Sequence, residues 1–235
     1  MRAAVAILLS LALAKPAFAD ITAKYAPPNS AATVRLEIAS NGDVRGDLYG
    51  KTAKQSSAFI IRNGQYYFLD TGPSGIGVIR AEDMNRLLLE KIDPATRAQE
   101  QQADNVLSFP EKGLATVNGR TGAAFDMQVG SGDLLSPESW AVMSSDPTLA
   151  PIGAAMVRVF KLSMTNVAMV NGQQTFRNML SVLKRGSPLS AVLFFGSAQL
   201  QSVDFKAIPA TEFALPAKPD TFEAARNRLS SEGKL

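Results

Sequence analysis

Apolar runs separated by Asn-Gly pairs recur through the first half of the chain. An Asn-Gly pair between two apolar segments is the strongest short-range signal for a tight β-hairpin. The pairs Asn41-Gly42, Asn63-Gly64 and Asn118-Gly119 therefore predict three antiparallel hairpins. A fourth pair, Asn171-Gly172, lies between two segments of helical period, so we expect it to join two helices.

The first hairpin, TVRLEIASNGDVRGDLYG at residues 33–50, is predicted to have a mainly apolar and a mainly polar face. A two-residue loop at Asn41-Gly42 would pair Ile38 with Arg45. In that register one face carries Val34, Leu36, Ile38 and Tyr49, and the other carries Arg35, Glu37, Ala39 and Leu48.

The second hairpin, FIIRNGQYYFLD, is apolar on both faces. With Asn63-Gly64 as its loop, one face pairs Ile61 with Tyr66 and Phe59 with Phe68, and the other pairs Ile60 with Tyr67 and Ala58 with Leu69. Such a strand pair lies in the middle of a sheet that is covered on both sides, or it lines a cavity on one side.

The apolar residues follow a helical period in three later segments. These segments are residues 79–92, a stretch from Pro147 to Met164, and residues 176–183, which end before Gly186. After Pro188 the pattern returns to strands, with a break at Gly196-Ser197. This order predicts an α+β fold in which an antiparallel sheet has helices packed on one face.

The N-terminal residues 1–19 have the three parts of a secretory signal peptide. Arg2 supplies the positive charge, an apolar run follows, and Ala17-Phe18-Ala19 forms a cleavage site after Ala19. The apolar run is too short to span a membrane, and no later segment is long enough. We therefore expect an exported periplasmic protein without a transmembrane segment. Residues 20–215 are predicted to form a single domain, and residues 216–235 a polar tail with a short helix capped by Asp220.

The composition of the chain excludes several kinds of chemistry. The chain contains no His and no Cys, so Ser-His-Asp and Cys-His nucleophiles, thiolate or imidazole zinc sites and haem ligation by those groups are impossible. Loss of residues 1–19 removes Arg2 and Lys15, so 24 basic residues become 22 against 21 acidic ones, and the net charge falls from +3 to +1. No basic cluster with interleaved aromatics suggests nucleic acid. We expect no cofactor and no metal.

The triplet Asp70-Thr71-Gly72 follows an apolar strand, as the catalytic carboxylate of an aspartic peptidase does. That reaction needs two carboxylates that share one proton. The chain has one such triplet, so catalysis would require a homodimer that brings two copies of Asp70 together. The simpler interpretation is that Asp70 and Gly72 provide the turn at the end of a strand.

Several segments carry a resemblance to a known superfamily. The main ones are the hairpin FPEKGLATVNGRTGAAFDMQV, the bend Arg185-Gly186-Ser187-Pro188-Leu189 and the closing Phe213-Ala214-Leu215-Pro216. Over most of its mature length the chain resembles uncharacterised exported proteins related to the LolA-like lipoprotein-carrier superfamily. The resemblance implies a curved antiparallel sheet, an unclosed half-barrel, wrapped around helices with an apolar space between. In characterised relatives that space receives acyl chains. The functional residues of the carriers do not map onto this chain.

The hairpin with two apolar faces and the resemblance together predict a non-catalytic periplasmic protein that binds an apolar ligand between sheet and helices. The ligand would be a lipid or a lipoprotein acyl chain. One alternative is a protein-interaction module that contacts an envelope protein during envelope stress or assembly, and another is the homodimeric peptidase that uses Asp70. The residues expected to line the ligand site are Phe59, Ile61, Tyr66, Phe68, Met156, Phe160 and Phe194.

Overall fold

The computed structural model describes residues 19–28, 32–50, 55–73, 75–93, 106–130, 133–134, 139–164, 173–193 and 196–235. The predicted signal peptide, apart from Ala19, lies outside the described residues, and so does the connection at Asn171-Gly172. Within the described ranges no helix is both long enough and apolar enough to cross a membrane.

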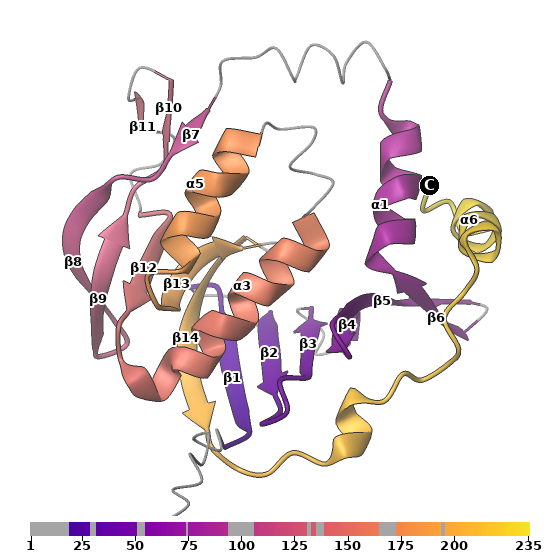
Figure 1. The fold of residues 1–235 in the computed structure, drawn as a ribbon, viewed down its shortest axis with the longest axis horizontal. Helices are drawn as coiled ribbons and strands as arrows, with labels where there is room; N and C mark the ends of the chain where they lie inside the picture. Colours follow the sequence, from indigo (N-terminus) through magenta and orange to yellow (C-terminus); the bar gives the residue numbers. More distant parts are fainter. Residues whose placement is uncertain are drawn as a thin grey trace, which may run out of the picture.

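Eleven strands form one large antiparallel sheet in the order β6-β5-β4-β3-β2-β1-β14-β13-β12-β9-β8. The edge strands β6 and β8 lie at opposite ends of a curved sheet that does not close into a barrel (Figure 1). A separate small sheet pairs β10 with β7 and β11. The strands are β1 Ile21–Ala26, β2 Thr33–Ile38, β3 Val44–Tyr49, β4 Gln55–Arg62, β5 Gln65–Gly72, β6 Gly75–Arg80, β7 Leu107–Ser108, β8 Glu111–Val117, β9 Arg120–Phe125, β10 Gln128–Val129, β11 Asp133–Leu134, β12 Ala141–Ser144, β13 Ser187–Leu193 and β14 Gly196–Asp204.

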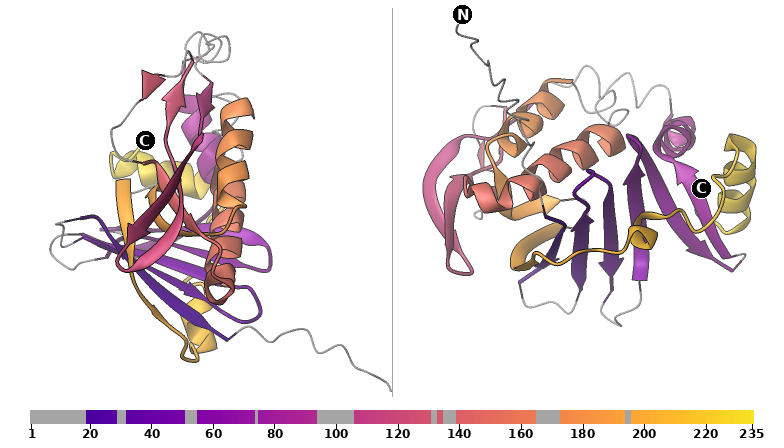
Figure 2. Two further views of the ribbon diagram at one scale, coloured as in Figure 1. Left: turned by 90° about the vertical axis from the view of Figure 1, so that its left-hand side faces the viewer. Right: turned by 60° about the horizontal axis from the view of Figure 1, so that its bottom comes forward.

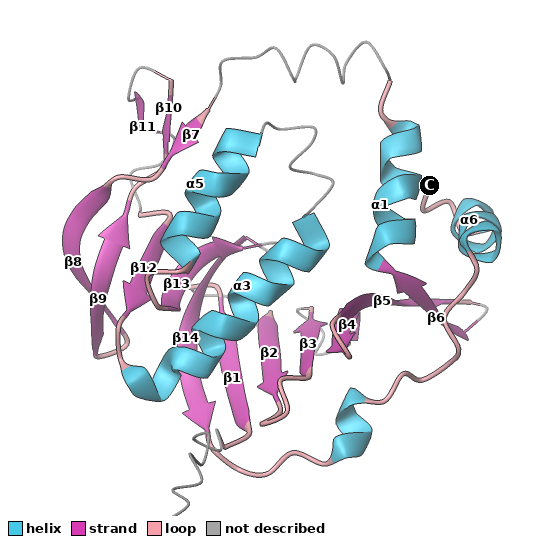
Figure 3. Cartoon of the chain, viewed as in Figure 1, coloured by secondary structure: helices cyan, strands magenta, loops and turns pink. Residues whose placement is uncertain are grey.

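The longer helices α1, α3 and α5 lie on the side of the sheet that faces the viewer in Figure 3. This arrangement confirms the predicted α+β fold, an unclosed antiparallel sheet with helices packed on one face. The helices are α1 Ala81–Lys91, α3 Ala150–Met164, α5 Gln173–Leu183 and α6 Phe222–Ser231, with the 3₁₀ turns η1 Pro147–Leu149 and η2 Ala210–Phe213.

The register predicted for the first hairpin is wrong by one residue. Ile38 pairs with Val44 because the loop holds three residues instead of two. The Ala39 amide donates to the Asp43 carbonyl at 2.9 Å, and Gly42 has a φ of +89°, as in a three-residue loop that ends in a left-handed glycine. The face that packs against α3, here called the inner face, therefore carries Val34, Leu36, Ile38, Val44, Gly46 and Leu48, and the outer face carries Arg35, Glu37, Arg45, Asp47 and Tyr49.

The register of the second hairpin is confirmed. Ile61 pairs with Tyr66 and Phe59 with Phe68 on the inner face. The turn residues Asn63 and Gly64 both have positive φ, 52° and 76°, as a type I′ turn requires. On the outer face these two strands and β6 form a second apolar cluster, which Leu215 of the C-terminal segment covers. The cluster consists of Ala58, Ile60, Leu69 and Val78. Both faces are therefore apolar because both are covered.

The C-terminal segment crosses the outer face, passes round the β6 edge and ends as α6 beside α1 (Figure 2). At the edge, the Asp220 amide donates to the Val78 carbonyl at 2.8 Å. The predicted short helix is present, but its cap is Thr221, whose side-chain oxygen accepts from the Ala224 amide at 3.2 Å. Ala225 and Leu229 of this helix pack in one apolar cluster with Ile79 of β6 and Leu87 of α1. The predicted polar tail therefore has a buried face.

Two element boundaries also differ from the prediction. The helix predicted from Ile79 begins at Ala81, because the preceding six residues pair with β5 as strand β6. The break predicted at Gly196-Ser197 is wrong, because both residues belong to β14.

Buried charges lie on the outer face of β2 and β3. Glu37 and Asp47 are 1% and 2% exposed. Arg35 donates to Glu37, and Arg45 donates to Asp47 at 2.9 Å and to the Glu212 carbonyl of η2 at 3.0 Å. Burial raises the pKa of Glu37 above its ordinary value, although Arg35 acts in the opposite direction. Within the described ranges, one carboxylate oxygen of Glu37 has no hydrogen-bond partner.

Replacing Glu37 with Gln is expected to change how stability depends on pH. A carboxyl group whose pKa is higher in the folded state binds its proton more tightly when folded, so stability is lost as pH rises through that raised pKa. Glu37→Gln removes this loss. Urea unfolding should show the variant gaining stability relative to the wild type as the pH rises from the ordinary value of 4.5 towards neutral. Glu223→Gln, exposed on α6, is the control, and parallel curves for Glu37→Gln and the wild type would contradict the prediction.

Candidate functional site

Three aromatic rings from β4 and β5 form a floor on the inner face. Phe59 and Tyr66 are stacked, with ring centroids 5.0 Å apart and 15° between their planes. Tyr66 and Phe68 follow at 4.8 Å and 57°. Gly46 of β3 provides space for Phe59, since a Cβ atom at Gly46 would lie 2.1 Å from the Cε1 atom of that ring. The Phe59 ring therefore lies across the neighbouring strand.

The structure brings together most of the residues predicted to line a ligand site. Phe59, Ile61, Tyr66 and Met156 belong to one buried cluster, and Phe68 packs against it. The other two predicted residues do not extend this group. Phe160 belongs to a different cluster, where it stacks on Phe176 of α5 at 4.9 Å, and Phe194 lies outside the described residues.

A pocket of about 220 Å³ opens beside the aromatic floor, where the turn between β4 and β5 meets α1 and α3. Tyr66 comes from the strand, Leu162 from α3, and Ala81 and Asn85 from successive turns of one face of α1. The full lining consists of Gly64, Gln65, Tyr66, Ala81, Glu82, Asn85 and Leu162.

Two polar side chains of this pocket are almost fully buried. Tyr66 is 6% exposed and Asn85 is 4% exposed. Within the part of the chain that the structure describes, neither side chain has a hydrogen-bond partner. Neither residue has an atom among the described side-chain atoms that are fully buried without a partner, so the Tyr66 hydroxyl and the Asn85 amide open to the pocket, where a ligand can contact them.

The pocket is suited to hydrogen bonding with a neutral group. Burial raises the pKa of Tyr66, so its hydroxyl group stays protonated and can donate. The Asn85 amide offers donors on its nitrogen and an acceptor oxygen. The one charged residue in the lining is the exposed carboxylate of Glu82. Among the described residues no group of three or more Asp or Glu side chains is placed to hold a metal ion.

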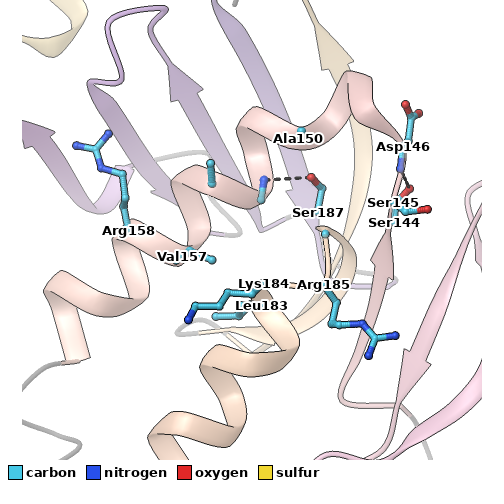
Figure 4. A pocket seen from close by; sticks show the side chains of 13 residues that line it. Ser144, Ser145, Asp146, Ala150, Val157, Arg158, Leu183, Lys184, Arg185 and Ser187 are labelled. Carbon is cyan, nitrogen blue, oxygen red and sulfur yellow. Dashed lines mark hydrogen bonds between the residues drawn. The ribbon is translucent and has the colours of Figure 1, made fainter.

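A wider concavity of about 550 Å³ lies where the first turns of α3 meet the end of α5 (Figure 4). There the Ser187 hydroxyl oxygen accepts from the Gly153 amide at 3.1 Å, which joins α3 to the first residue of β13. Figure 4 shows that its cationic side chains Arg158, Lys184 and Arg185 point in different directions. Arg185 pairs with Glu111 of β8 at 2.9 Å. The polar groups of this concavity do not converge on a ligand position.

Asp70 is held by the C-terminal helix. Its carboxylate accepts from Arg228 and, at 2.8 Å, from Lys234, and Arg228 also donates to Asp220 at 3.0 Å. Strand β5 ends at Gly72, so the triplet closes a strand as the simpler interpretation expects, but Asp70 pairs with Gly77 inside the ladder and does not belong to the turn. An aspartic peptidase needs two carboxylates that share a proton, whereas two cations of the same chain surround Asp70. This arrangement gives the peptidase hypothesis no support and assigns Asp70 a role in attaching α6.

The contribution of α1 to the pocket was not predicted from the helical period of residues 79–92. Leu88 fits that apolar period but is 46% exposed, whereas the polar Asn85 is buried. Asn85 lies one turn after Ala81, on the side of α1 nearest α3. The sequence does contain a sign of this site, because Asn85 is a polar residue at helical spacing from apolar residues that are buried. A polar residue in such a position is unusual unless it has a hydrogen-bond partner or a ligand.

No family model, no curated protein and no solved structure matches this chain.

Proposed function

We propose that this chain is an exported, periplasmic, non-catalytic protein that holds an apolar ligand, the acyl chain of a lipid or lipoprotein, against the inner face of the sheet. The observation that carries the proposal is the aromatic floor of Phe59, Tyr66 and Phe68, which ends at an open pocket beside Tyr66. The unclosed sheet is also the architecture that the resemblance to the LolA-like superfamily implies.

The alkyl chain of the ligand enters the protein between helices α1 and α3. The two helices meet at the pocket through the small side chain of Ala81, the unpartnered Asn85 and the half-buried Leu162. In the bound state the alkyl chain lies over Phe68 and Phe59, and α1 has to move aside to admit it, because Ala81 and Phe59 are packed in one core cluster in the unliganded protein. Burial of each CH₂ group contributes about 0.8 kcal/mol.

Affinity for the mature chain, residues 20–235, is therefore expected to rise with alkyl length. In a competition assay against a fluorescent naphthylamine probe, the series octanol, decanol and dodecanol should gain up to about fourfold in affinity per CH₂ group. Native mass spectrometry of protein taken from the bacterial envelope without detergent should show a bound lipid.

The variant Leu162→Trp places a large ring at the junction of α1 and α3 and should abolish the dependence on alkyl length. Leu88→Trp makes the same change on the exposed side of α1 and should leave it intact. Affinities that do not depend on chain length in the wild type, or that both variants reduce equally, would contradict the proposal.

A further inference from the structure

We propose that the pocket of Tyr66 and Asn85 recognises the neutral carbonyl group of an acyl amide or acyl ester, so that the protein selects acyl derivatives over free fatty acids and hydrocarbons. This inference rests on the proposed function and names the ligand class of the same site. Its basis is the pair of unpartnered polar side chains in the pocket, each more than nine-tenths buried.

The hydrogen-bonding groups of the pocket match a carbonyl group next to an N–H or an ether oxygen. The Tyr66 hydroxyl and the Asn85 nitrogen donate to the carbonyl oxygen, and the Asn85 oxygen accepts from the N–H of an amide. Both polar groups open to the pocket, so a ligand that fills it must supply their hydrogen bonds or leave them unpaired. A bound carbonyl group would supply these hydrogen bonds, and a hydrocarbon would not.

The charge of the pocket disfavours an anionic head group. Among the residues that the structure describes, its lining contains the carboxylate of Glu82 and neither Lys nor Arg. A fatty-acid carboxylate would meet a like charge at the entrance and would find no cation to replace its lost hydration. The alkyl chain attached to the carbonyl has an apolar route, because Tyr66 is stacked on Phe59 and is in contact with Phe68.

The test compares three ligands with alkyl chains of similar length in competition against the naphthylamine probe: N-methyldodecanamide, dodecanoate and tridecane. The wild type should bind the amide about tenfold more tightly than tridecane. Dodecanoate should bind more weakly than the amide. Asn85→Leu and Tyr66→Phe should each remove most of the preference for the amide, measured as the ratio of amide to tridecane affinity in the same variant. Tyr67→Phe is the matched control, since Tyr67 packs on the outer face.

A second measurement separates recognition from a structural role. Because Asn85 has no hydrogen-bond partner among the described residues, Asn85→Leu should maintain or raise the free energy of unfolding, whereas a structural asparagine would lower it when removed. Equal affinity of the wild type for amide and tridecane, or a preference for dodecanoate, would overturn this inference and leave the proposed function standing. Failure of all three ligands to bind would overturn both.

Discussion

Replacing Gly46 with Ala should lower the free energy of unfolding by about 1–3 kcal/mol, the usual cost of overpacking a core. In most extended positions a change from Gly to Ala stabilises a protein, because it restricts the unfolded chain. The sign is reversed here because the new methyl group would lie 2.1 Å from the Phe59 ring. The ring must leave its place over β3, and it loses its stacking on Tyr66. Urea unfolding measures the loss, and near-ultraviolet circular dichroism reports the displaced rings.

A double-mutant cycle identifies the cause of this loss. Phe59→Leu alone should destabilise the protein because it leaves a cavity. In combination with Phe59→Leu, Gly46→Ala should cost far less than it does alone, because the shorter side chain leaves room for the methyl group. Strictly additive losses would show that contact between Gly46 and the ring is not the reason, and would remove one support for the aromatic floor.

The second large effect is expected at Arg228, which joins α6 to the sheet. Arg228 donates to both Asp70 and Asp220, and its side chain is 16% exposed. Gly77 allows this approach, because a Cβ atom there would overlap the guanidinium group. Arg228→Met would remove the cation that Asp70 and Asp220 share, with Lys234 remaining near Asp70. The expected loss is about 2–3 kcal/mol, between the values for exposed and for fully buried ion pairs.

Arg226 provides a matched control two residues earlier on the same helix. It pairs with Glu90 and Glu223, but its side chain is 39% exposed, so Arg226→Met should cost much less than Arg228→Met. Hydrogen exchange should show α6 opening in the Arg228 variant and remaining protected in the Arg226 variant. Equal protection in both would mean that the apolar contacts of Ala225 and Leu229 hold α6 without the ion pairs.

Local patterns in the sequence were enough to predict most of the elements. The Asn63-Gly64 and Asn118-Gly119 turns, the pairing of Phe59 with Phe68, and the helices α3 and α5 follow from turn chemistry and periodicity alone. The first hairpin was predicted in the wrong register because Asn-Gly also fits a three-residue loop. The choice depends on which face must be buried, and short-range sequence does not contain that information.

The candidate site was partly predictable for the same reason. The apolar residues of β4 and β5 were identified because alternation along a strand assigns faces directly. Asn85 was missed because its burial depends on the rotation of α1, which is set by contacts of that helix with β5, β6 and α6. Phe160 was assigned to the ligand site from helical spacing, but α3 has apolar residues on two sides, and Phe160 faces α5.

The sequence by itself determined the α+β class, the hairpin with two apolar faces and the absence of His and Cys chemistry, because composition and local periodicity are properties of the chain alone. The tertiary structure alone decided that the C-terminal segment covers the outer face, that Asp70 binds Arg228 and Lys234, and that Tyr66 and Asn85 line one pocket. These last features join residues far apart in the sequence, and their positions depend on packing between whole elements. A local sequence pattern contains no information about packing between whole elements.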